Sequence, residues 1–281
     1  MLARVPASSA NLGPGFDTLA VALNLYVDVS VEAADDFCIT SAGEGAGLFD
    51  DEGHLAAVVA REVLGHSRVS IHVESQIPLS RGLGSSASLA LAAAAAAGAA
   101  DPLALATRVD GHAENAAASR YGGLVAAALR NGVPVARSLT LDSEWRFVVV
   151  IPQAQLATSD ARRVLPHEVP FADAVFNLNA MGLLIAGLAD RNNFVSGSMG
   201  DALHQPYRMA LLPFAAGVLA ALVEAGASGA CWSGAGSTML GLVGVEEAEA
   251  VAAAARTHLS DEGVAGTVRV LDADRTGLVT R

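Results

Sequence analysis

The run Pro-Leu-Ser-Arg-Gly-Leu-Gly-Ser-Ser-Ala at residues 78–87 limits the possible folds more than any other part of the chain. Before it, residues 69–75 alternate apolar and polar side chains with the period of a β-strand. After it, residues 87–97 are rich in Ala and Leu and lack Gly and Pro, which predicts a buried helix. The glycines permit backbone conformations that a Cβ resists, and Ser85 and Ser86 are suitable N-cap residues. The sequence therefore predicts a strand, a tight turn and a helix start, whose amides and dipole form an anion site.

Composition excludes several classes of protein. The 281 residues are 52% hydrophobic and 16% charged, which indicates a globular protein. The net charge of −12 argues against nucleic acid as a partner, and the absence of Lys rules out a Walker A loop. Two cysteines are too few for a disulfide framework and lack metal-ligand spacing. The first residues lack the apolar core of a signal peptide, and the Ala-rich run is too short to span a membrane. We therefore expect a soluble, cytoplasmic protein with no membrane partner.

The string at residues 78–87 resembles the P-x-x-x-G-L-G-S-S-A phosphate loop of the GHMP kinases. This family is named after galactokinase, homoserine kinase, mevalonate kinase and phosphomevalonate kinase. The resemblance implies that the loop holds the phosphates of ATP. It places these residues at the nucleotide: Pro78, Ser80, Arg81, Gly82, Leu83, Gly84, Ser85, Ser86 and Ala87.

A second motif lies at residues 5–17, where Gly-Pro-Gly forces a turn flanked by Asn11 and Asp17. On the residues alone, these two side chains could simply cap and close the turn. The segment matches the P-A-S-x-A-N-L-G-P-G-F-D motif of homoserine kinases at every fixed position. That resemblance implies that both side chains contact the substrate, with Asp17 binding its ammonium group.

Residues 110–115, Asp-Gly-His-Ala-Glu-Asn, and a later Gly-Gly pair resemble the family pattern E-G-H-P-D-N followed by G-G. The resemblance assigns His112 and Asn115 to the substrate, and Asp110 with Ser86 to Mg²⁺. One carboxylate suffices for Mg²⁺ because phosphate oxygens and waters complete its shell. A solvated helix end without a specific role is the other reading of these charges. Homoserine kinases resemble a variant without a general base, and Glu114 or His112 would be the fallback base.

Three further segments complete the resemblance. Residues 158–166 match T-x-x-A-R-x-x-L-P, which implies substrate contacts for Thr158 and Arg162. Residues 201–208 match D-x-L-H-x-P-Y-R, whose Arg208 is expected to pair with the substrate carboxylate. Residues 233–238 resemble the third GHMP motif, although a glycine-rich hairpin explains them as well. His54 stands where the family often has an Asn that serves adenine, and an exposed His at a helix start is the alternative.

Taken together, the resemblance implies an α+β, two-domain GHMP kinase fold. Residues 1–153 would form the ATP-binding half, like domain 2 of ribosomal protein S5, and residues 154–281 a ferredoxin-like half that completes the substrate site. The implied reaction transfers the γ-phosphoryl of ATP to the hydroxyl of L-homoserine with Mg²⁺, in a homodimer of the threonine pathway. A kinase for another small alcohol, or a non-catalytic nucleotide-binding relative, remains possible. The apolar residues of a helix at 171–188 occupy so many faces that we expect it to be central.

Overall fold

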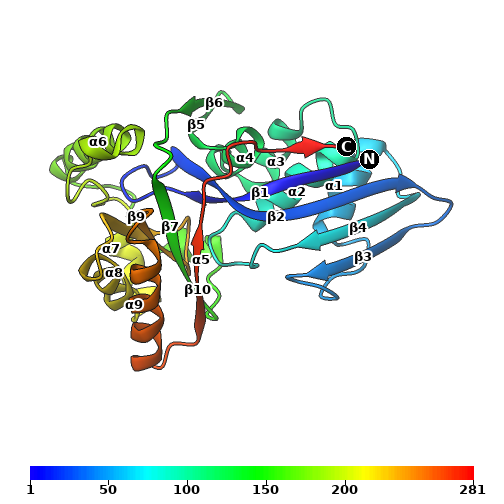
Figure 1. Cartoon of the computed structure of the whole chain (residues 1–281). Coiled ribbons are helices and arrows are strands. Elements are labelled where there is room, and N and C mark those ends of the chain that lie inside the picture. Colours follow the sequence, from blue (N-terminus) through cyan, green and yellow to red (C-terminus); the bar gives the residue numbers. More distant parts are fainter.

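Two β-sheets with helices packed against them form the framework of the protein (Figure 1). The computed structural model describes all residues from 1 to 281. The first sheet has the strand order β11-β1-β2-β4-β3, with β5 paired to β2 and β6 paired to β5. Its strands are β1 (Leu2–Ala10), β2 (Leu19–Ala33), β3 (Cys38–Gly43), β4 (Val69–Ser75), β5 (Leu124–Arg130), β6 (Val133–Leu139) and β11 (Val279–Thr280).

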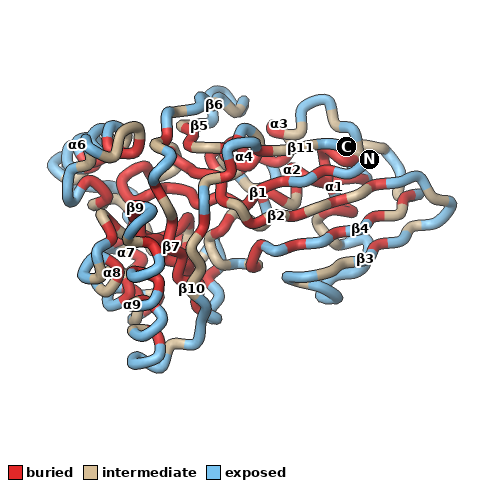
Figure 2. The backbone as a smooth tube through the Cα atoms, in the orientation of Figure 1, coloured by how far each residue is buried: buried red, intermediate tan, exposed pale blue.

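Four helices are associated with this first sheet, and α2 (Ser85–Ala96) contacts the other three. It packs on β1 and β2 and contacts α1 (Leu55–Leu64), α3 (Pro102–Asp110) and α4 (Ala113–Tyr121). Nine of its twelve residues are buried, and most are Ala, whose small side chain lets the neighbouring elements approach closely. Figure 2 shows this helix and the strands beneath it as a continuous buried region. The predicted strand at 69–75 and the buried helix after the glycine turn are both confirmed.

The second sheet is antiparallel, with the order β10-β7-β9-β8. Its strands are β7 (Trp145–Pro152), β8 (Gly229–Trp232), β9 (Met239–Gly244) and β10 (Gly266–Leu271). Helices α8 (Ala215–Glu224) and α9 (Ala248–Asp261) pack on it. The expected boundary at residue 153 comes directly after β7, which pairs within this second sheet, and β11 returns to pair with β1. The α+β class expected from the sequence is confirmed.

Three more helices lie in the chain between β7 and β8 of the second sheet: α5 (Thr158–Arg163), α6 (Phe171–Ala189) and α7 (Gln205–Arg208). The expectation that the long apolar helix is central is wrong. Helix α6 lies at one end of the molecule, with Phe171 85% and Leu178 65% exposed (Figure 1). Only Asn177, Ala180, Leu184, Gly187 and Leu188 of this helix are buried. Apolarity predicts that a surface is covered, but it does not say whether the cover comes from the same chain.

Candidate functional site

One polar cavity lies where the two sheets meet, and every proposed substrate side chain borders it. The cavity has a volume of about 720 Å³, including space open to solvent. It collects side chains from the ends of β1 and α3, from α4, α5 and α7, and from the β8–β9 loop. Its lining includes these sequence-predicted residues: Asn11, Asp17, Ser80, Arg81, Gly82, Gly84, Ser85, Ser86, Asp110, His112, Glu114, Asn115, Thr158, Arg162 and Arg208.

The glycine turn of residues 80–84 leads into the first turn of α2 at the floor of this cavity. Gly84 has φ +69°, and a Cβ built on it would lie 2.2 Å from Ser8 Oγ, so only glycine fits. The prediction that Ser85 or Ser86 caps the helix is wrong, because Gly84 is the N-cap residue and both serines belong to the first helical turn. Their hydroxyls are therefore free to face the cavity. The first-turn amides and the helix dipole leave a site suited to phosphate.

The β8–β9 loop holds this turn in place from the other sheet. Ser233 Oγ lies 2.7 Å from the carbonyl of Gly82, to which it donates, and 2.8 Å from Ser9 Oγ. The N–H of Thr238 donates to the carbonyl of Arg81 over 3.1 Å. A hairpin loop between two strands is what the residues alone predict, and the structure packs that hairpin against the phosphate turn.

Not every residue of the turn faces the cavity. The side chains of Pro78, Leu83 and Ala87 are buried and do not line it. The Arg81 guanidinium donates to the carbonyls of Leu79 (3.0 Å), Pro152 (2.8 Å) and Gln153 (2.6 Å). Arg81 therefore ties the turn to the end of β7, and most of its donors are used by backbone.

The N-terminal turn places Asp17 against Arg162. The Arg162 guanidinium donates to both carboxylate oxygens of Asp17, over 2.5 and 3.1 Å. The resemblance assigned the Asp17 carboxylate to the ammonium group of the substrate, whereas in the structure this carboxylate is paired with Arg162. Asn11 closes the turn, because its carbonyl oxygen accepts the Asp17 N–H (3.0 Å) and its amide donates to Gly234 (2.9 Å). Asn11 therefore closes the turn, as the residues alone allow, and both Asn11 and Asp17 border the cavity.

Arg208 reaches the same cavity from α7 and is only 1% exposed. Its guanidinium donates to the carbonyls of Ala161 (3.2 Å) and Gly234 (3.1 Å) and to His204 Nδ1 (3.1 Å). Burial, and secondarily the charge of Arg162, lowers the pKa of Arg208 to about 10, so the side chain stays cationic at neutral pH. Two cations, Arg162 from α5 and Arg208 from α7, therefore border the cavity together with Asp17.

The junction of α3 and α4 supplies two carboxylates. The motif at residues 110–115 spans two helices. Gly111 is the C-cap residue of α3, and His112 is the N-cap residue of α4. Burial raises the pKa of Asp110 to about 6 and that of Glu114 to about 7, where nearby Asp17 and Asp110 add to the effect. Burial lowers the pKa of His112, so this imidazole tends to be neutral. The reading of a solvated helix end does not fit, because Glu114 is only 4% exposed.

These carboxylates are suited to a divalent cation bound together with phosphate. Asp110, Glu114 and Ser86 border the same cavity as the phosphate turn. The protein offers no cluster of three or more His, Cys, Asp or Glu side chains that could hold a metal by themselves. Mg²⁺ fits such a place because it needs one or two protein carboxylates and takes its other ligands from phosphate and water.

A second, more apolar cavity adjoins the phosphate turn on the side of β3, β4 and α1. Phe49, Leu55, Leu79 and Leu89 line it, and it shares Ser80, Ser85 and Ser86 with the polar cavity. His54 borders it as the N-cap residue of α1, with Nδ1 accepting the Ala56 N–H over 3.1 Å. Burial lowers the pKa of His54. His54 is thus a half-buried residue at the helix start, and an apolar pocket beside a phosphate site suits a nucleobase.

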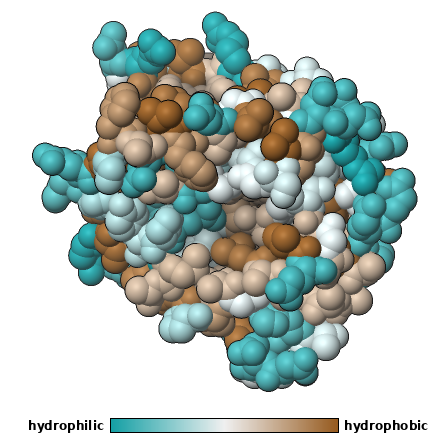
Figure 3. Space-filling view, turned by 90° about the vertical axis from the view of Figure 1, so that its left-hand side faces the viewer, coloured by the Kyte–Doolittle hydropathy of each residue, from teal (hydrophilic) through white to brown (hydrophobic).

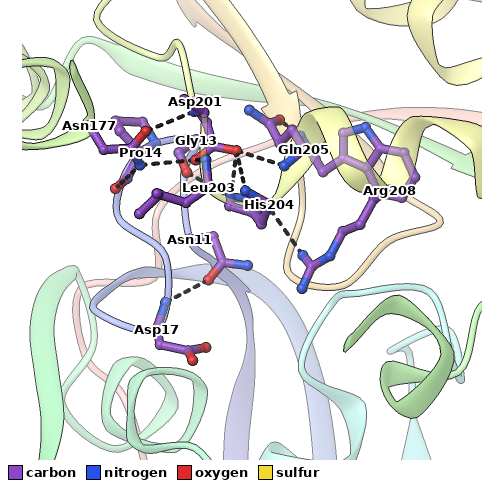
Figure 4. A network of polar contacts seen from close by, with 12 residues as sticks. Asn11, Gly13, Pro14, Asp17, Asn177, Asp201, Leu203, His204, Gln205 and Arg208 are labelled. Carbon is purple, nitrogen blue, oxygen red and sulfur yellow. Dashed lines mark hydrogen bonds and ion pairs between the residues drawn. The ribbon is translucent and has the colours of Figure 1, made fainter. Parts of the chain in front are cut away.

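Sequence reasoning missed a group of buried polar residues behind the cavity, drawn in Figure 4. They are Asn177, Asp201 and His204, none of which is more than partly exposed, and they connect α6 and α7 to the N-terminal turn. Two signals could have identified them. Asn177 is polar in an otherwise apolar helix, and Asp201 and His204 are fixed positions of the motif that contributed Arg208.

Comparisons with known proteins find matches in both halves of the chain. The family model for the GHMP kinases N terminal domain matches residues 54–132, and that for the GHMP kinases C terminal matches residues 181–261. A homoserine kinase of Moorella thermoacetica is 40% identical over 254 residues, covering 85% of this chain and 86% of the relative. One from Desulfitobacterium hafniense is 35% identical, covering 98% and 97%.

A solved structure extends the likeness to three dimensions. The crystal structure of homoserine kinase from Cytophaga hutchinsonii superposes with a TM-score of 0.86 at 26% identity, covering 99% of this chain and 96% of that one. Both halves of the chain therefore match in sequence and in fold. The chain belongs to the GHMP kinase family, within the group whose curated members are homoserine kinases.

Proposed function

We propose that this protein transfers the γ-phosphoryl group of ATP to the side-chain hydroxyl of L-homoserine, giving O-phospho-L-homoserine for threonine biosynthesis. One observation carries the proposal. The cavity that contains the phosphate turn also contains Asp17, Arg162 and Arg208, in a chain 40% identical to a homoserine kinase. An α-amino acid carries its ammonium and carboxylate groups on the same carbon. The Asp17 carboxylate and the Arg162 guanidinium lie side by side, so they can face the two neighbouring charged groups of an amino acid; groups held far apart could not.

The chemistry this site must supply is positioning and charge neutralisation. Phosphoryl transfer passes through a loose transition state, so a base is less necessary than an in-line approach of the hydroxyl. The backbone amides at the start of α2 would hold the phosphates. The acceptor would be held by Asn11, Asp17, His112, Asn115, Thr158, Arg162 and Arg208. We assign no general base, and Glu114 or His112 remains the fallback.

The metal and the nucleobase complete the proposal. Asp110 and Ser86 would hold Mg²⁺, with Glu114 as the other carboxylate that could do so. Mg²⁺ would neutralise charge on the β- and γ-phosphate oxygens. The apolar cavity beside His54 would receive adenine, with His54 Nε2 available for a hydrogen bond to the base, since Nδ1 caps α1.

We also propose that the protein acts in the cytoplasm as a homodimer. Phe171, Val175, Phe176, Leu178 and Leu183 of α6 are 38–85% exposed, and Figure 3 shows apolar residues across this end of the molecule. The helix carries a single charged residue, Asp173, so two copies could pack without repelling each other. By length and composition alone α6 could also cross a membrane. The same apolarity suits a protein interface.

ADP release in the presence of different acceptors tests the proposed reaction. The purified protein is given MgATP with homoserine, with mevalonate, with 4-hydroxybutyrate, which lacks the ammonium group, or with 3-aminopropanol, which lacks the carboxylate. We expect homoserine to exceed each of the others in kcat/KM by at least about 100-fold, because each analogue leaves a charged side chain of the site without its partner on the acceptor. Equal turnover without any acceptor would indicate a different function. A preference for mevalonate would indicate a kinase that acts on an alcohol other than homoserine.

A further inference from the structure

His204 is a buried polar side chain to which the proposed reaction gives no task, yet both of its ring nitrogens are engaged (Figure 4). The residue is fully buried. Nε2 lies 2.8 Å from the carbonyl oxygen of Gly13, and Nδ1 lies 3.1 Å from Nη1 of Arg208. A guanidinium only donates, so Nδ1 must accept from Arg208. The proton is therefore on Nε2, which donates to Gly13.

The backbone around His204 is fixed by Asp201. Its carboxylate accepts the N–H groups of Leu203 (3.0 Å), His204 (3.0 Å) and Gln205 (2.6 Å). Asn177 on α6 donates to Asp201 (2.9 Å) and is placed to donate to the carbonyl of Pro14 (3.2 Å). The start of α7 and the Gly-Pro-Gly turn are therefore held against each other by buried hydrogen bonds. Such networks are costly to break because each freed polar group stays buried.

Two guanidiniums close to the ring favour its neutral form. The ring stacks on Phe16 with centroids 4.9 Å apart, and the guanidinium carbons of Arg162 and Arg208 each lie 5.4 Å from the Phe16 ring centre. A protonated imidazole would add a third cation and turn a donor toward Arg208. Burial, with a contribution from Arg208, lowers the pKa of His204 to about 4, although Asp201 lies 3.5 Å from Nε2 and acts in the opposite direction.

We propose that His204 is a positioning residue for the amino-acid acceptor. Its neutral imidazole fixes the Arg208 guanidinium to the turn that carries Asn11 and Asp17, joining segments 191 residues apart in sequence. The imidazole thereby sets the spacing between the group that would bind the acceptor's carboxylate and the group that would bind its ammonium. This role rests on the proposed function of the cavity.

Two variants separate the two hydrogen bonds. In His204→Asn, the amide oxygen can take the place of Nδ1 and accept from Arg208, whereas the bond to Gly13 is lost. In His204→Gln, the amide nitrogen can reach the carbonyl of Gly13, whereas the acceptor for Arg208 is lost. We expect the KM for homoserine to rise about 10-fold or more in His204→Gln and about 3-fold in His204→Asn, with the KM for ATP changed less than twofold.

Val251→Ala in α9 is the control for a purely structural role. Val251 is fully buried in the second core cluster, so this variant loses stability without touching the network. We expect its KM for homoserine to equal that of the parent. The inference is overturned if folded His204→Gln keeps the parent's KM for homoserine, or if its KM for ATP rises in parallel. A parent protein that shows no homoserine-dependent ADP release would instead overturn the proposed function.

A spectroscopic measurement tests the inference without relying on activity. In protein labelled with ¹⁵N-histidine, the His204 resonances identified with the His204→Asn variant should show a protonated Nε2 and an accepting Nδ1. These signals should not change between pH 5.5 and 8. An Nδ1-protonated ring, or a titration midpoint near the ordinary value for histidine, would contradict the assignment whatever the protein phosphorylates.

Discussion

Arg208 shows how a single side chain can serve both the structure and the binding site. Three of its contacts are to protein acceptors, two of them backbone carbonyls, and it still borders the cavity. Its neighbour Arg162 is held differently, through a two-oxygen pair with Asp17. The two guanidiniums therefore border the same cavity without sharing a hydrogen-bond partner. Fixed cations of this kind bind a carboxylate with little loss of side-chain freedom.

Arg208→Lys should raise the KM for homoserine by about 30-fold while the KM for ATP changes less than twofold. An ammonium group keeps the charge but cannot satisfy several acceptors in a plane and also face the substrate. Steady-state kinetics with each substrate varied in turn measures both constants. Arg163→Lys is the matched control, because Arg163 is exposed on the same helix as Arg162 and pairs only with Asp160. A larger rise in the KM for ATP than in the KM for homoserine would mean that Arg208 does not bind the amino acid.

Glu114→Gln should change how stability depends on pH. The pKa of Glu114 is raised to about 7, above its ordinary 4.5, so the folded state retains a proton that the unfolded state releases. This contribution to stability is therefore complete below about pH 4.5 and is lost as the pH rises through about 7. The free energy of unfolding of the variant, from urea titrations in EDTA, should fall less between pH 5 and 8 than that of the parent. Parallel pH dependences would contradict the burial of this charge.

At the scale of elements, the sequence predicted the local structure well wherever the turn-forming residues and the pattern of apolar side chains indicated the same element. Strand β4 has the predicted bounds, and the buried helix predicted after the glycine turn is α2. The N-cap of α2 was mistaken because serine propensity was weighed without the close approach of Ser8, which only Gly84 allows. Helix α6 was misplaced because its apolar residues were taken to be buried within the chain, whereas most of them are not buried.

Gly84→Ala should weaken ATP binding by at least about 10-fold. The added Cβ would collide with Ser8 Oγ and strain a left-handed backbone, which displaces the first amides of α2. Isothermal titration with MgATP or a non-hydrolysable analogue measures the affinity. Gly98→Ala is the control, since Gly98 has φ +83° near the other end of α2 and nothing lies within 4 Å of its added Cβ. Equal affinity for MgATP in both variants would mean that the glycine turn does not bind the nucleotide.

At the scale of the molecule, the two halves meet at one polar cavity, and the chain passes between them more than once. Every segment matched by motif reaches this cavity, although the segments are spread from Asn11 to Gly236. The motifs could predict which residues gather there because each carried its own fixed pattern. They could not predict the contact between Asp17 and Arg162, or the network behind them. Such contacts depend on how the two sheets are oriented, and no local pattern encodes that orientation.

Leu178→Asp should convert the proposed dimer to a monomer without unfolding it. Leu178 is 65% exposed on α6, so a charge there costs the monomer little but would be buried in an interface. Light scattering after size exclusion measures the mass. Val133→Asp is the control, because Val133 is 60% exposed on β6 of the first sheet. A parent that is already monomeric at micromolar concentration would contradict the dimer.

A crystal structure with homoserine and a non-hydrolysable ATP analogue tests the central claim most directly, because that claim is geometric. We predict phosphates on the amides that begin α2, and the amino acid between Asp17, Arg162 and Arg208, with its hydroxyl in line with the γ-phosphorus at about 3–3.5 Å. Homoserine bound outside this cavity, or oriented with its hydroxyl away from the phosphates, would contradict the account.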